Sequence, residues 1–154
     1  MPRLITALCA AQLLFLGATP MDAQDSSYDQ NALRVESRLG DLQIVRGIQG
    51  TVVAHAGLFR GPKVASLVSQ SEQALAEAKV FERNYEPGQA FAALGIATLG
   101  AAIGTSRIPD INAAIPSGLT AASFLLIAYG GSKLESAYRA LSRSLWFYNR
   151  ELKR

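Results

Sequence analysis

Two uncharged stretches decide how this chain folds: QAFAALGIATLGAAIGTS at residues 89–106 and AAIPSGLTAASFLLIAYGGS at residues 113–132. Each holds 18 to 20 residues. At ~1.5 Å of rise per residue, a helix of this length approaches the ~30 Å hydrocarbon core of a bilayer. Because the link at residues 107–112 is short and polar, the two helices must run antiparallel. The sequence therefore predicts a two-helix transmembrane hairpin over residues 89–132.

Small side chains recur at helical spacing in both stretches. In lipid, helices associate through close backbone approach, which small residues allow. We therefore predict eight helix-packing residues: Ala93, Ala97, Gly100, Ala101 and Gly104 in the first stretch, and Ala114, Gly118 and Ala122 in the second. These helices are only weakly hydrophobic, so a pair buried inside a soluble helical bundle is the alternative.

The segment before the hairpin, residues 63–88, predicts an amphipathic helix. Ser69-Gln70-Ser71-Glu72 fits a capping box at its start. Apolar side chains then line one face at spacings of three and four. We expect Pro87-Gly88 to end this helix.

Residues 25–62 have a different pattern, typical of strands. Short apolar runs around Leu33, over Leu42–Val45 and over Thr51–Ala54 are separated by glycine-bearing breaks. This pattern predicts two or three strands in a small antiparallel meander. Since so small a sheet is not stable alone, it must pack on a helix or on a partner chain.

The tail, residues 133–154, predicts a basic amphipathic helix. Its apolar stripe follows a 4-3-4-3-4 spacing: Leu134, Tyr138, Leu141, Leu145, Tyr148 and Leu152. One interpretation is contact with lipid or a partner, since aromatic rings and arginines suit a membrane interface. The residues predicted for that contact are Arg139, Arg143, Trp146, Phe147, Tyr148 and Arg150. The other is packing against the helix around residues 69–85 or against a second copy.

Residues 1–24 have the layout of a secretory signal, with Arg3 followed by an apolar run and a break at Thr19-Pro20. An uncleaved anchor helix is the alternative. Either way we expect the part that follows to be exported to the periplasm of a bacterial cell envelope, with inner and outer membranes both open. The only cysteine, Cys9, lies in this run, so a cleaved chain has no thiol.

Patterns that carry chemistry are missing from the sequence. His55 is the only histidine, and neither a GxSxG turn nor a phosphate-loop glycine spacing occurs. We therefore predict a non-enzymatic protein without cofactor or metal. The basic tail has no nucleic-acid-binding module beside it, so we expect no nucleic-acid partner.

The small-residue spacings between Gln89 and Gly131 resemble those of the glycine-zipper two-helix envelope proteins of bacteria. This resemblance implies a packed, oligomerising membrane hairpin and assigns no chemistry. We expect a mainly α membrane protein of α+β class. Its function would be that of a structural or accessory subunit of a membrane assembly, with membrane lipid and further copies or a larger complex as partners. The alternative is an exported soluble binding module with a buried helical hairpin.

Overall fold

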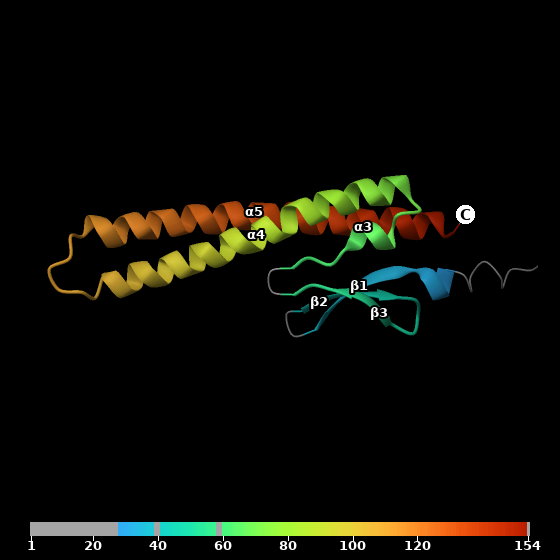
Figure 1. The fold of residues 1–154 in the computed structure, drawn as a ribbon, viewed down its shortest axis with the longest axis horizontal. Helices are drawn as coiled ribbons and strands as arrows, with labels where there is room; N and C mark the ends of the chain where they lie inside the picture. The colour runs from blue at the N-terminus through green and yellow to red at the C-terminus, as the bar shows by residue number, and fades with distance from the viewer. Residues whose placement is uncertain (1–27, 39–40, 58–59, 154) are drawn as a thin grey trace, which may run out of the picture.

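The computed structural model describes residues 28–38, 41–57 and 60–153, and these form a mostly helical chain with one small sheet. The strands are β1 (Leu33–Arg38), β2 (Asp41–Arg46) and β3 (Thr51–His55). The helices are α3 (Val64–Leu67), α4 (Glu72–Thr105) and α5 (Ala114–Glu151). Figure 1 shows α4 and α5 as an antiparallel hairpin, with the sheet beside one end only. The predicted signal segment, residues 1–24, lies outside the described residues.

The sheet confirms the predicted antiparallel meander. Its strand order is β1-β2-β3, with Leu33 opposite Arg46 and Gln43 opposite His55. The turn after β2 begins at Gly47, whose φ is +68°. A Cβ at this position would also lie 2.7 Å from the Gln30 carbonyl oxygen. Both the backbone angle and the crowding therefore require glycine here.

One side chain joins the sheet to the end of α5 by hydrogen bonds. Asn149 accepts a hydrogen bond from the Leu33 amide at 2.8 Å and donates one to the Leu33 carbonyl at 2.7 Å. Below this contact lies a shared core of sheet, α3 and both long helices, which includes Ile44, Val64, Phe81 and Leu141. The sheet thus gains from the helices the apolar cover that three strands cannot supply themselves.

The start of α4 corrects the predicted capping box. The cap is Ser71, whose Oγ accepts a hydrogen bond from the Ala74 amide at 3.3 Å, whereas Ser69 lies outside the helix. The Ser71 hydroxyl also donates to Glu151 Oε1 at 2.8 Å. This bond explains the choice of serine, because it joins the beginning of α4 to the end of α5.

The predicted helix end at Pro87-Gly88 is wrong, because α4 continues through both residues to Thr105. Proline has no amide to donate, so the helix loses a hydrogen bond at this point. Packing compensates for that loss. The backbone of Gly88 lies so close to α5 that an added Cβ would be 2.9 Å from Leu134 Cγ.

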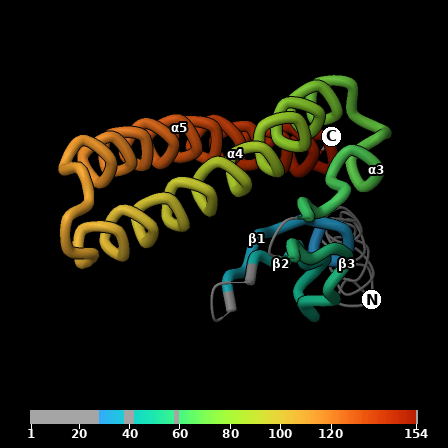
Figure 2. The backbone as a smooth tube through the Cα atoms, turned by 60° about the vertical axis from the view of Figure 1, so that its left-hand side comes forward, coloured from blue at the N-terminus to red at the C-terminus, as the bar shows by residue number. Residues whose placement is uncertain are grey.

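Buried residues recur every seven positions along the α4–α5 contact, and all but Phe81 are small. On α4 this series is Ala74, Phe81, Gly88, Gly95 and Ala102, and on α5 it is Ser123, Gly130, Ala137 and Ser144. A Cβ at Gly130 would lie 2.6 Å from the Ala92 nitrogen. Figures 1 and 2 both show α4 crossing α5. We infer that backbone contact at these glycines fixes the crossing point.

Substitution of glycine by alanine should lower thermal stability at positions inside the α4–α5 contact and not at positions outside it. Gly130→Ala forces apart two backbones, at a cost of about 1–3 kcal/mol that exceeds the gain of up to about 1 kcal/mol in helix propensity. Its thermal unfolding, followed by circular dichroism, should shift to lower temperature. Gly100→Ala is the matched control, because its Cβ would meet no described atom within 4 Å. An equal shift in both variants would contradict this assignment of the interface.

Removal of the Asn149 side chain should loosen the sheet without opening the hairpin. Asn149→Ala leaves the Leu33 amide and carbonyl without partners, which costs about 1–3 kcal/mol. Amide hydrogen exchange at Leu33 should accelerate, while exchange near Gly95 stays slow. Asn112→Ala, at the opposite end of the hairpin, is the control and should leave Leu33 unchanged. Unaltered exchange at Leu33 in Asn149→Ala would show that other contacts hold the sheet.

Candidate functional site

In the far half of the hairpin, the helices contain no charged residue, and Arg107 and Asp110 lie in the connecting loop. On the α4 side this zone covers residues 87–106, and on the α5 side residues 111–132. We call these two segments the uncharged arms. Twenty residues of helix span about 30 Å. Both helices are long and apolar enough, by length and composition, to cross a membrane.

The two arms begin at nearly the same height along the hairpin. Lys133 Nζ donates to Asn84 Oδ1 at 3.3 Å, and Gly88 lies against Leu134. Glu86, the last charge on α4, therefore lies within about one helical turn of the level of Lys133, the first charge on α5 beyond the arm. At the other end, charge returns only in the connecting loop, at Arg107 and Asp110. The arms thus form one continuous uncharged layer across both helices.

This layer is largely uncovered by the rest of the chain. In the most apolar window of each helix, only 17% of residues on α4 and 11% on α5 are buried. Large apolar side chains stand exposed along the arms, among them Ile96 at 65%, Phe124 at 62% and Leu125 at 72%. A core helix of a soluble protein would be mostly buried. Figure 1 shows why these are not, since the sheet lies beside the opposite end.

The serine and threonine hydroxyls within the arms form hydrogen bonds within their own helices. Every serine and threonine hydroxyl in them donates to a carbonyl of its own helix, three or four residues earlier. These residues are Thr98, Thr105, Ser106, Ser117, Thr120, Ser123 and Ser132. Such internal bonding leaves the hydroxyl protons with no need of water. The surface of the arms is therefore compatible with an apolar medium.

Aromatic rings mark the charged end of the layer. Phe91 and Tyr129 contact edge to face, with ring centroids 4.9 Å apart. The Lys133 ammonium lies 5.6 Å from the centroid of the Tyr129 ring. Tyrosine beside lysine at the end of an apolar segment is typical of a membrane–water boundary.

The predicted packing residues do not form the contact between α4 and α5. Ala97, Ala101, Ala114 and Ala122 are exposed and Ala93 is half-buried. A Cβ at Gly100, Gly104 or Gly118 would meet no described atom within 4 Å. Seven of the eight residues thus face away from the partner helix, and their role in packing stays a prediction for contacts outside the hairpin. The four-residue spacing selects residues that face outward. The contact between the helices instead follows a seven-residue period, which the sequence also contains.

The predicted lipid-contact residues of the tail divide between core and surface. Tyr148 is buried in the core, and Leu141 and Leu145 of the same stripe are buried with it. Packing against α4 is therefore the correct alternative for this face. The Arg150 guanidinium lies 4.6 Å from the Trp146 ring centroid and 5.2 Å from that of Phe147, and it donates to Gln73 at 2.9 Å.

The two remaining tail arginines are exposed and paired with acids. Arg139 pairs with Glu135, and Arg143 Nη1 lies 3.7 Å from Glu77 Oε1. Nearby, burial and the adjacent Tyr85 raise the pKa of the Tyr138 hydroxyl. The tail surface is thus a set of exposed ion pairs, worth little individually for stability.

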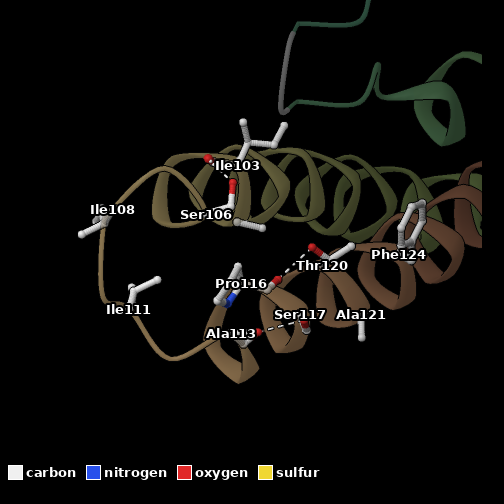
Figure 3. A pocket seen from close by; sticks show the side chains of 11 residues that line it. Ile103, Ser106, Ile108, Ile111, Ala113, Pro116, Ser117, Thr120, Ala121 and Phe124 are labelled. Atoms are coloured by element: carbon white, nitrogen blue, oxygen red, sulfur yellow. Dashed lines mark hydrogen bonds between the residues drawn. The ribbon is translucent and has the colours of Figure 1, made fainter.

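A cavity of about 730 Å³ opens where the arms separate near the loop. Figure 3 shows Ile103, Ile108 and Phe124 among the side chains around it. Its hydroxyls, on Ser106, Ser117 and Thr120, donate to backbone carbonyls. Apart from these three residues, the side chains that line the cavity are apolar.

No cluster suited to metal binding is present in the described part of the chain, where three or more His, Cys, Asp or Glu side chains do not come together. His55 is exposed on β3. The comparisons with known proteins find no matching family model, no matching curated protein and no matching solved structure. Function is therefore inferred from the geometry of the hairpin itself.

Proposed function

We propose that this chain is a non-enzymatic subunit of a membrane assembly, anchored by the uncharged arms and carrying its sheet outside the bilayer. The observation that supports this most strongly is the uncharged layer, which begins at nearly the same height on both helices and is largely uncovered by the chain. Two helices of a water-soluble protein would have no reason to lose their charges at the same level. A bilayer imposes that requirement on everything that crosses it.

The dimensions of the layer agree with this proposal. About 20 residues per arm give roughly 30 Å, the thickness of a hydrocarbon core. Internally bonded hydroxyls and the Tyr129–Lys133 pair at the boundary add independent support. The signal-like start of the sequence favours a bacterial envelope, with the sheet on the periplasmic side.

The outward small residues support a role in assembly. Gly100, Gly104 and Gly118 leave backbone exposed on the outer sides of the arms. In lipid, exposed backbone of this kind is where another helix can come close. We propose that further copies of this chain, or helices of a larger complex, pack there, as the resemblance to glycine-zipper envelope proteins implies.

An exported soluble binding module is the alternative function. It would need a partner to cover both arms, since the chain leaves them exposed. Carbonate extraction of membranes separates the two functions. Recovery of the native chain in the soluble fraction would reject membrane integration.

A charge placed in an arm should prevent integration. Ala97→Asp puts a carboxylate near the middle of the layer, at a cost of about 2.5–3.5 kcal/mol for insertion. The arms are only marginally hydrophobic, so most of this variant should become extractable with carbonate. Ala76→Asp is the matched control, because Ala76 is exposed on the charged half of the same helix. Equal retention of both variants in the membrane would argue against a bilayer-spanning hairpin.

Bulk placed on the outer glycines should block assembly while leaving the hairpin folded. Gly104→Leu and Gly118→Leu project into space that is open in the monomer. Chemical cross-linking in membranes should show fewer oligomers, with helicity unchanged. Gly131→Leu is the control: its space is equally open, but thirteen residues from Gly118 place it on another side of α5. Cross-linking that is the same in all three variants would contradict assembly through this face.

A further inference from the structure

A second cavity, of about 390 Å³, lies at the opposite end of the molecule from the loop. It is formed between β2, the segment joining α3 to α4, and the end of α5. Polar groups dominate its wall, which includes Asn31, Arg46, Ser66, Ser69, Gln70 and Tyr148. Three segments far apart in the sequence thus meet around one polar space.

Arg46 is the unusual member of this wall. Its side chain is half-buried, and its Nε is fully buried without a hydrogen-bond partner. No carboxylate in the described residues comes within 4.0 Å of the Arg46 guanidinium. The Nε of Arg150 is also buried without a partner, but the Arg150 guanidinium donates to Gln73, whereas no such bond is found for Arg46 among the described residues. Asp29 lines a neighbouring cavity that Arg46 also borders, but makes no ion pair with it. A buried N–H without a hydrogen-bond partner is costly.

The neighbouring groups complete a set of donors. Ser66 donates to the Lys63 carbonyl and Ser69 to the Ser66 carbonyl, so their protons are already used. Within the described residues, the Gln70 amide and the Tyr148 hydroxyl have no hydrogen-bond partner, so both can donate to a ligand. Arginine binds carboxylate and phosphate through two parallel hydrogen bonds. We propose that this cavity binds the carboxylate or phosphate group of a small molecule, with Arg46 as the anchor and Gln70 and Tyr148 as further donors.

The source of the anion follows from the proposed membrane position, and this step alone depends on that proposal. Tyr148 stands fifteen residues beyond Lys133 on α5, which is about 22 Å along the helix. The headgroup layer on each side of a bilayer adds only about 5–8 Å to the hydrocarbon core. Lipid headgroups therefore do not reach the cavity, and the ligand is a soluble molecule.

Occupancy would act on the junction between sheet and hairpin. Arg46 belongs to β2 and Tyr148 to α5, and Asn149 beside it already holds Leu33. An anion bound between them adds a second connection at the same place. The ligand would therefore strengthen the attachment of the sheet to the membrane anchor.

The test is a titration of the full chain in dodecyl maltoside, with inorganic phosphate in one arm and acetate in another. The ¹H–¹⁵N resonances of the Arg46 Nε–H and the Gln70 side-chain amide are followed, with sodium chloride at equal ionic strength as reference. Saturable shifts at both groups are expected for at least one anion. Arg46→Gln should weaken the binding read at Gln70 at least about tenfold, since it removes a charge-assisted bidentate contact. Arg60→Gln, which changes an exposed arginine outside the cavity wall, should leave it unchanged.

Shifts that do not saturate, or that sodium chloride reproduces, would overturn the proposal, as would equal binding by Arg46→Gln. Should that variant fail to fold, the titration of the native chain decides alone. A further arm compares nanodiscs of phosphatidylglycerol with nanodiscs of phosphatidylcholine. Saturation by phosphatidylglycerol alone would overturn the soluble-anion assignment. Because binding is read at Arg46 and Gln70, these results are independent of carbonate extraction.

Discussion

Backbone contact between α4 and α5 at Gly88, Gly95 and Gly130 is the constraint on which the rest of the structure depends. At this contact the helices need no large side chains between them, so bulky apolar residues such as Ile96 and Leu125 lie on the outside. The same contact supports α4 as it continues through Pro87, because Gly88 lies against both the backbone and the side chain of Leu134. The two helices thus run without a break from the sheet to the loop.

The two halves of the helical hairpin, one beside the sheet and one toward the loop, suit different surroundings. Near the sheet, Phe81, Leu141 and Tyr148 are buried in a core of the soluble type, and charged residues cover the outer surface. Beyond Glu86 and Lys133 the side chains become uncharged together on both helices. One continuous pair of helices thus connects a small globular head to an apolar shaft. Bonds such as that of Ser144 to the Ala74 carbonyl, at 2.8 Å, hold the head half together across the helices.

Sequence patterns predicted the meander, the long uncharged helices and the apolar stripe of the tail, because each depends on local periodicity. They failed where a distant residue decides the outcome. Pro87 is a helix end by local rules, and only Leu134, 47 residues later, supplies the packing that carries α4 past it. No sequence pattern around Asn149 or Arg46 predicts its role, because the residues that surround each of them come from other elements. Four-residue spacing selects small residues on any face, so it could not separate Gly100 from Gly95.

The glycines on the outer sides of the arms lower the stability of their helices. Glycine in a helix interior is about 1 kcal/mol less favourable than alanine, so Gly100 and Gly118 each weaken the helix that contains them. At Gly95 and Gly130 this cost is offset inside the chain, where a Cβ would meet backbone at 3 Å or less. At Gly100 and Gly118 nothing in the described chain offsets it, because no described atom lies within 4 Å of the Cβ position. A second helix backbone packed at these positions would offset it, and this is the physical reason behind the proposed role in assembly.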